Sequence, residues 1–390
     1  MYSLLLSIIY LAFISLGLPD SLLGAAWPIM YGQLQVPISY AGVISMIIAI
    51  NTVISSLQSD RLTKKFSTGK VTAISAAMTA AAILGFSFSS SFWMLCLFAI
   101  PYGLGAGSVD AAINNYVALH YSSKHMSWLH CMWGVGTIIS PYVMGFALSS
   151  GNGWNTGYRW VGMGQLALTV ILFISIPLWN RNNKSNKQVQ GSSENHMPLS
   201  LRQIITIKGA KQVMITFFCY CALEQTAMLW ASSYMVLHNG INAEKAANLA
   251  SLFFIGITVG RAVNGFLMMK FSDTQMIRVG QVLIGCGIVM LFLPLGNMVA
   301  LSGFIVIGLG CAPVYPCIIH STPYRFGEDK SQALIGVQMA SAYVGTSLMP
   351  PLFGLIANNI SVSLLPVYLV IILALMVIMH EILVKKTKKA

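Results

Sequence analysis

Charged residues are scarce in this chain. Only 8% of its 390 residues are charged and just 10 are acidic, whereas 56% are hydrophobic. Soluble globular domains are typically about one quarter charged. Together with a mean hydropathy of +0.74, this composition excludes an ordinary soluble protein. It indicates an all-α membrane protein whose helices cross the bilayer many times.

Several catalytic signatures are also absent. The sequence contains no Walker A pattern, no HExxH motif, no paired CxxC and no nucleophile elbow, so neither ATP hydrolysis nor an intramembrane enzyme is supported. The seven cysteines all fall in apolar stretches and lack the spacing of a disulfide framework or a metal site. We therefore expect packing thiols, no enzyme activity, no metal and no cofactor.

Basic residues are in excess, and the net charge is +12. Such an excess can indicate a nucleic-acid partner. Here, however, 19 of the 22 basic residues fall on one side of the expected spans, in alternate loops and in the C-terminal tail. Arg159 and Lys245 lie in the opposite loops, and Arg261 lies within a span. The positive-inside rule therefore predicts that both termini lie in the cytoplasm. We expect no nucleic-acid partner, and a location in the bacterial cytoplasmic (inner) membrane.

Apolar stretches of about 20 residues predict twelve spans. The first carries Asp20 and has no basic residue before it, so we expect a retained helix rather than a cleaved signal. Polar residues without periodicity predict a cytoplasmic linker over 180–209, between six-helix bundles at 1–179 and 210–390. The predicted spans lie near 4–31, 38–58, 70–91, 93–120, 127–149, 158–179, 210–238, 245–270, 275–295, 298–320, 331–357 and 361–384.

The two halves of the sequence match each other in three places that occur in the same order. Internal repeats of this kind predict two pseudo-symmetric six-helix bundles with a central site near mid-membrane. The matched segments are Val135–Gly145 with Val344–Gly354, Gly103–Ile113 with Gly308–Ile318, and Lys65–Ser67 with Lys270–Ser272.

Three acidic residues fall within predicted spans: Asp20, Asp110 and Glu224. A carboxylate at membrane depth costs roughly 2.5–3.5 kcal/mol on insertion scales, so each should face a water-filled cavity or a partner. Burial also raises the pKa of carboxylic acids in general, which suits reversible proton binding near neutral pH. We expect these three residues to couple transport to protons. The alternative is a purely structural role, in which each carboxylate is held by hydrogen bonds.

Polar and aromatic side chains accompany these carboxylates at similar depths. Amides, hydroxyls and indoles suit a neutral polyol, because they bond its hydroxyls and stack on its C–H face. For His130 the alternative is a hydrogen-bonded interior residue, and for the two tryptophans it is packing or anchoring at the membrane interface. The candidate substrate-binding residues are Trp27, Asn114, Asn115, His130, Trp133, Gln225, Tyr315, Gln338 and Tyr343.

The span that contains Asp110 has its own pattern. Helical spacing over Ile100–Tyr121 puts Gly103, Gly107, Asp110 and Asn114 on one stripe. The glycines predict close approach by a neighbouring helix. Arg261, within the eighth span, is open to two interpretations: it braces a cytoplasmic gate or binds an anionic solute.

The whole chain resembles the Major Facilitator Superfamily. The loop signature is visible as SLQSDRLTKKFS, with Ser56 and Thr63 at two positions that are usually glycine. The closest likeness is to the fucose:proton symporters and their sodium-glucose relatives, through LGLPDSLLGAAWP, GAGSVDAAINNY, ALEQTAMLW and GCAPVYP. The resemblance implies a major facilitator fold, and gate roles for Asp60, Arg61, Lys64 and Lys65.

The resemblance also implies roles for two carboxylates. Asp20 would couple protons, and Asp110 would lie at the sugar, where the fucose carriers have Glu. We therefore expect a monomeric carrier of a small neutral sugar or polyol, driven by a coupling ion (proton, or else sodium) within the lipid bilayer. Proton-coupled export of a drug or metabolite and a non-transporting membrane sensor are the alternatives.

Overall fold

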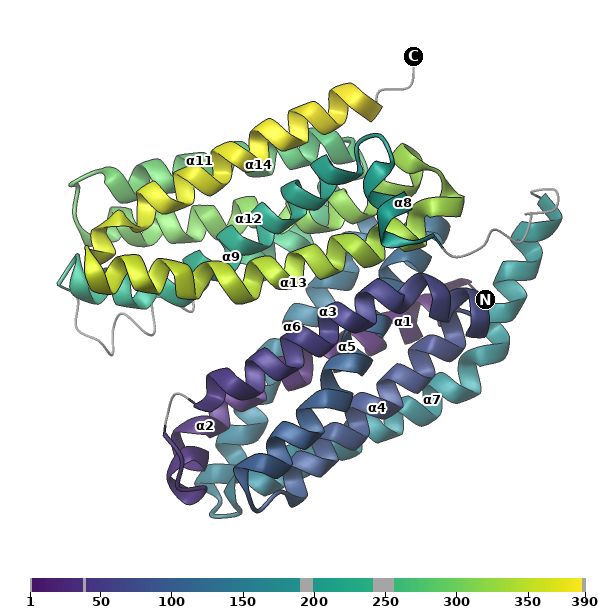
Figure 1. The fold of residues 1–390 in the computed structure, drawn as a ribbon, viewed down its shortest axis with the longest axis horizontal. Helices are drawn as coiled ribbons and strands as arrows, with labels where there is room; N and C mark the ends of the chain where they lie inside the picture. The colour runs from purple at the N-terminus through teal and green to yellow at the C-terminus, as the bar shows by residue number, and fades with distance from the viewer. Residues whose placement is uncertain (1, 38–39, 190–198, 241–255, 388–390) are drawn as a thin grey trace. The chain divides into compact units, whose positions relative to one another are not determined.

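The computed structural model describes residues 2–37, 40–189, 199–240 and 256–387, and this part of the chain is helical nearly throughout (Figure 1). It contains no β-strand within those ranges, as the all-α class predicts. The N-terminal half holds α1 (Tyr2–Asp20), α2 (Leu22–Gln33), α3 (Ala41–Phe66), α4 (Thr68–Phe88), α5 (Phe92–His120), α6 (Ser123–Ser149) and α7 (Gly153–Val189). The C-terminal half holds α8 (Leu201–Thr206), α9 (Ala210–Leu237), helical residues 256–267, α11 (Asp273–Phe292), α12 (Asn297–Phe326), α13 (Glu328–Asn359), η2 (Val362–Leu364) and α14 (Leu365–Thr387).

Eleven spans in the described residues are long and apolar enough to cross a membrane. They correspond to the expected spans with one exception, the eighth at 245–270. Its residues 245–255 lie outside the described part of the chain, while 256–267 are helical.

The first span is interrupted. One helix ends at Asp20 and the next begins at Leu22, although the pair forms one apolar span over Leu4–Trp27. Pro19 lacks the N–H that a continuous helix would use. Ser21, between the helices, donates its hydroxyl to the Thr137 carbonyl (2.8 Å) and contacts the Ser140 hydroxyl (2.8 Å) on α6. The break therefore places Asp20 at a helix end that α6 holds.

The chain forms two compact units. The first comprises Met1–Tyr116 and Met132–Leu199, and the second comprises Val117–Cys131 and Ser200–Ala390. Within the first, α4 packs along α7; within the second, α11 packs along α12, and α9 packs between α13 and α14. The segment 117–131, the end of α5 and the start of α6, therefore packs with the C-terminal half of the sequence. The expected division at 179 and 210 stays a prediction, and α7 runs on to Val189.

Glycines allow close helix contacts at the positions that the sequence patterns indicate. A Cβ on Gly103 or Gly107 of α5 would collide with α3 backbone at Ile48 or Thr52, which confirms the expected close approach. Gly136 meets the Ile14 carbonyl of α1 in the same way. Its repeat partner Gly345 on α13 lies against the Phe218 carbonyl of α9, 2.7 Å from an added Cβ. Equivalent glycines thus serve equivalent helix pairs, which supports the internal duplication.

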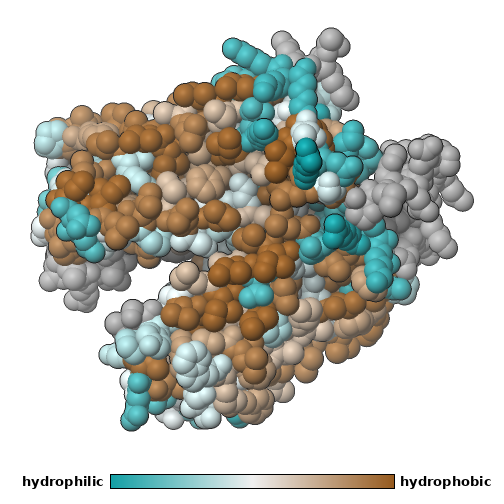
Figure 2. All heavy atoms as spheres, viewed as in Figure 1, coloured by the Kyte–Doolittle hydropathy of each residue, from teal (hydrophilic) through white to brown (hydrophobic). Residues whose placement is uncertain are grey.

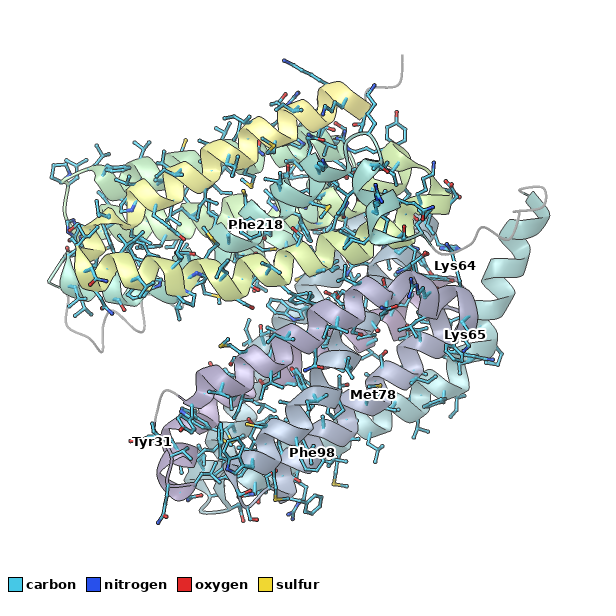
Figure 3. The ribbon with its side chains drawn as sticks, in the orientation of Figure 1. Tyr31, Lys64, Lys65, Met78, Phe98 and Phe218 are labelled. Carbon is cyan, nitrogen blue, oxygen red and sulfur yellow. The ribbon has the colours of Figure 1, made fainter. Side chains whose placement is uncertain are left out.

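Many large apolar side chains are exposed along the spans. Large side chains such as Tyr142, Phe146 and Ile371 are 63–76% exposed along the spans, as lipid contact requires. Figure 2 shows hydrophobic residues along the helices and hydrophilic ones gathered toward helix ends. Lys64 and Lys65 mark one such end, that of α3 (Figure 3).

Candidate functional site

Asp20 lies at the break in the first span and is held by two neutral donors. The Tyr102 hydroxyl of α5 donates to its Oδ1 (2.9 Å), and the Trp133 indole Nε1 of α6 donates to its Oδ2 (2.9 Å). Within the described residues, no basic side chain forms an ion pair with it. Asp20 is nevertheless exposed. The Asp20 carboxylate is therefore accessible and has no basic counter-charge among the described residues.

Tyr102 is a site residue that the sequence patterns did not reveal. It lies eight positions before Asp110, about 12 Å along α5 at 1.5 Å per residue. It is only 6% exposed and belongs to the apolar core of the first unit, so by pattern alone it is a packing residue. Only its contact with Asp20, 82 residues away in sequence, identifies it.

Asp110 has a different environment. The Asn114 amide donates to its Oδ1 (2.8 Å) and to its main-chain carbonyl (2.9 Å), one turn along α5. Asn114 is fully buried and Asn115 is 7% exposed, whereas Asp110 is half-buried. The carboxylate thus keeps an accessible face while an amide orients it.

Glu224 and Arg261 form an ion pair inside the second unit. The distance from Arg261 Nη2 to Glu224 Oε1 is 3.4 Å, and both side chains are nearly buried. The His130 ring meets Tyr315 edge-on at 4.4 Å between centroids, and both interact electrostatically with Arg261. The structure thus gathers two expected substrate residues around a buried charge pair.

The other expected substrate residues lie in three kinds of surroundings. Trp27 is 5% exposed, within the core of the first unit. Gln338 is fully buried and exchanges hydrogen bonds with Thr322 (3.1 and 3.3 Å). Gln225 and Tyr343 are half-buried. Their binding roles, like those of the residues above, stay predictions.

The expected gate residues lie at the end of α3. Lys64 Nζ pairs with Asp60 Oδ2 at 3.0 Å, and the same oxygen accepts the Leu199 amide at 3.4 Å. The other Asp60 oxygen is buried without a hydrogen-bond partner in the described residues. Arg61 reaches Gln58 (3.5 Å), and Lys65 lies over the Phe66 ring (5.3 Å). Asp60 therefore ties α3 to Leu199, the last residue of the first unit.

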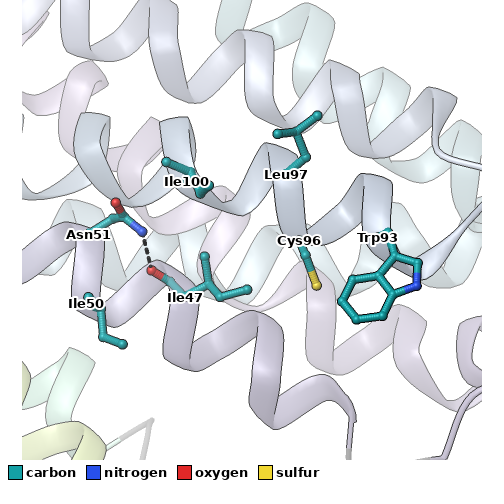
Figure 4. Close-up of a pocket in the computed structure, with 7 residues that line it drawn as sticks. All are labelled: Ile47, Ile50, Asn51, Trp93, Cys96, Leu97 and Ile100. Carbon is teal, nitrogen blue, oxygen red and sulfur yellow. Dashed lines mark hydrogen bonds between the residues drawn. The ribbon is translucent and has the colours of Figure 1, made fainter.

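An apolar groove on the first unit contains none of these residues. It lies between α3 and α5, and the one polar side chain in it, Asn51, donates to the Ile47 carbonyl at 2.8 Å (Figure 4). Such a lining suits an acyl chain better than a polyol. The groove is lined by Ile47, Ile50, Asn51, Trp93, Cys96, Leu97 and Ile100.

Known proteins resemble this chain over most of its length. "Bypass of stop codon protein 6" of Saccharomyces cerevisiae is 21% identical over 93% of this chain and 79% of its own length. The glucose/mannose transporter GlcP of Bacillus subtilis is 21% identical over 77% of this chain and 75% of its own length. The crystal structure of FucP, the E. coli fucose:proton symporter, in the outward conformation has a TM-score of 0.77 at 14% identity. That match covers 96% of this chain and 97% of FucP.

These similarities agree with a match to a family model. The model, described as Major Facilitator Superfamily, matches residues 9–239 and 213–390, and so covers nearly the whole chain. The expected fold class, twelve membrane-spanning helices in two six-helix halves, is thereby confirmed. Family and fold are those of multi-pass membrane transporters and not of enzymes. This chain belongs to the Major Facilitator Superfamily.

Proposed function

We propose that this transporter moves a small neutral polar solute, a sugar or polyol, across the cytoplasmic membrane together with protons. The observation that carries the proposal is Asp20 at the break in the first span, bonded by Tyr102 and Trp133 and paired with no cation in the described residues. A membrane carboxylate with neutral partners is not held in its ionised form by a neighbouring cation, so it can bind a proton more readily than a paired one. Asp20 is thus the coupling group.

Protonation of Asp20 would change its hydrogen bonds. The ionised carboxylate accepts at both oxygens. Once Oδ2 carries a proton it becomes a donor and can no longer accept freely from the Trp133 N–H. The indole is then free to pack its ring on a solute, and solute binding would in turn favour the protonated form.

Asp110 is the proposed solute contact. A carboxylate oriented by Asn114 can accept hydrogen bonds from two neighbouring hydroxyls, the pattern that a sugar ring offers. Two similar proteins, a glucose/mannose transporter and a fucose:proton symporter, support a sugar as the solute. Orientation follows from the loop charges: both termini lie in the cytoplasm of a bacterial cell. We also propose bundles at 1–179 and 210–390 and a monomer as the transporting unit.

Proteoliposomes with an imposed inward proton gradient test this function. Wild type should accumulate at least one labelled sugar from a panel of hexoses and pentoses, and the external medium should become alkaline as it does so. Asp20→Asn should lose accumulation but keep sugar exchange at equal pH, because the uncharged amide mimics the protonated state. Asp110→Asn should lose both.

Asp329→Asn provides the matched control, since this carboxylate is exposed in the first turn of α13. Its uptake should equal that of wild type. Full gradient-driven accumulation by Asp20→Asn would refute the coupling role. Wild-type transport of cationic dyes with no sugar transport would instead favour the export alternative.

A further inference from the structure

His320 lies in a hydrogen-bonded cluster that the proposed transport site does not use. Its Nδ1 is 2.8 Å from Asp273 Oδ2 and 2.7 Å from the Ser123 hydroxyl, and its Nε2 is 3.2 Å from the Tyr121 carbonyl. The Ser123 hydroxyl also donates to Asp273 Oδ1 at 2.8 Å. Three parts of the second unit meet here: α12, the first turn of α11, and the junction of α5 with α6.

Both ring nitrogens face groups that accept hydrogen bonds, because the Ser123 hydroxyl beside Nδ1 donates its one proton to Asp273 Oδ1. An ionised carboxylate and a main-chain carbonyl accept and do not donate. A neutral imidazole has only one N–H, so either tautomer would turn a lone pair toward an oxygen lone pair, at Asp273 or at Tyr121. Only the imidazolium satisfies both sides at once.

One of the surrounding charges, that of Asp273, balances this cation. Asp273 contacts it directly and lies in the first turn of α11, where the helix dipole favours a negative charge. Arg325, five residues on along α12, is held by the hydroxyls of Thr274 (2.8 Å) and Thr387 (2.9 Å). The remaining titratable or charged neighbours are Lys124 and His125 beside Ser123 on α6, Cys317 and Tyr324 on α12, and Arg278 on α11.

The cluster holds one end of segment 117–131. Farther along, the Ser127 hydroxyl donates to the Arg261 carbonyl (2.7 Å) and accepts from Asn264 (2.9 Å), and Trp128 Nε1 donates to the Ala262 carbonyl (3.3 Å). These contacts involve no group that titrates near neutral pH. At the His320 end, by contrast, loss of one proton costs at least one hydrogen bond.

We propose that His320 is a second proton-binding site, separate from Asp20, and that its protonated form clamps segment 117–131 onto α11 and α12. Both ends of the segment continue into helices of the first unit. A carrier that alternates access must loosen attachments of this kind during its cycle. Deprotonation of His320 on the side of the membrane that it faces is the step that loosens this one.

Hydrogen–deuterium exchange of the purified full-length protein tests the clamp without any substrate. Exchange is measured at about pH 6 and about pH 8 and corrected for the intrinsic rate. Loss of a hydrogen bond to a charged group should lower the protection of peptides from 117–131 by about tenfold at the higher pH. In His320→Gln, whose amide keeps one donor and one acceptor, this difference between the two pH values should disappear. Asp273→Asn should abolish it as well.

His238→Gln is the matched control, because the same change is made at the far end of α9 in the same unit. It should keep the wild-type difference. Equal protection of wild type at both pH values would overturn the proposal, as would an unchanged difference in a folded His320→Gln protein. Since no solute is present, failure of the sugar proposal would leave this result unaffected.

Discussion

The three carboxylates within the spans have three different kinds of partner. Asp20 accepts from a phenol and an indole, Asp110 from an amide, and Glu224 pairs with a guanidinium. A carboxylate whose partners are neutral donors can lose its charge by binding a proton. A buried guanidinium opposes this loss, because each of the two buried charges then depends on the other.

The ion pair should therefore matter to stability as a unit. Glu224→Gln leaves the Arg261 charge buried without its carboxylate, and we expect it to destabilise the protein by about 3–5 kcal/mol. The double change Glu224→Gln with Arg261→Gln should restore most of this loss, as measured by thermal unfolding in detergent. Glu381→Gln serves as the control, because it breaks the exposed pair with Arg278 and should cost under about 1 kcal/mol. A double variant as unstable as the single one would contradict this account.

Residue types in the sequence indicate which groups could carry chemistry, but they indicate few of the contacts between those groups. His130 and Tyr315 were expected at a site, and their rings do lie in contact. The sequence patterns did not indicate Tyr102 or His320. Each lies on an apolar helix, and its proposed role depends on a contact with a residue more than 40 positions away. Helical periodicity describes one helix at a time, so it cannot reveal such pairs.

At the scale of the helices, α5 combines packing and chemistry on one element. Its glycines bring the α3 backbone close, while Tyr102 and Asp110 supply polar groups. The sequence pattern predicted the glycine contacts because helix spacing fixes one face. It did not predict the break at Ser21, since the hydroxyl contacts that hold this break come from α6, more than 110 residues later.

The close contact between α3 and α5 can be tested by enlarging one glycine. In Gly107→Leu the new side chain would collide with the Thr52 carbonyl and the Ser56 hydroxyl, so the helices must separate. We expect overpacking to lower the free energy of unfolding by about 1–3 kcal/mol. Gly164→Leu on α7, where no atom lies within 4 Å of an added Cβ, should leave thermal stability unchanged. Equal effects of the two changes would show that general helix propensity, and not this contact, decides the outcome.

At the scale of the whole molecule, hydropathy and the internal repeats predicted the class of fold. Composition separates lipid-facing from aqueous segments directly, and a duplicated sequence implies a duplicated bundle. The attachment of 117–131 to the C-terminal half could not be predicted in this way. It depends on Ser123, Asp273 and His320, which are up to 197 residues apart in sequence.

The proposed orientation of the molecule can be checked directly. If the C-terminus is cytoplasmic, as the loop charges predict, a green fluorescent protein fused after Ala390 should fluoresce in bacterial cells, and an alkaline phosphatase fused there should be inactive. An alkaline phosphatase fused within the loop that contains Arg159 should be active. The opposite pattern would reverse the proposed topology.

The partners of Asp20 also bear on how the protein is made. Tyr102 and Trp133 follow it by 82 and 113 residues in the sequence. At about 5–20 residues per second, the ribosome needs roughly 6–23 seconds after Asp20 to synthesise the second donor. Until then the nascent first span carries an acid whose donors are incomplete, so its stability in the lipid depends on helices not yet translated.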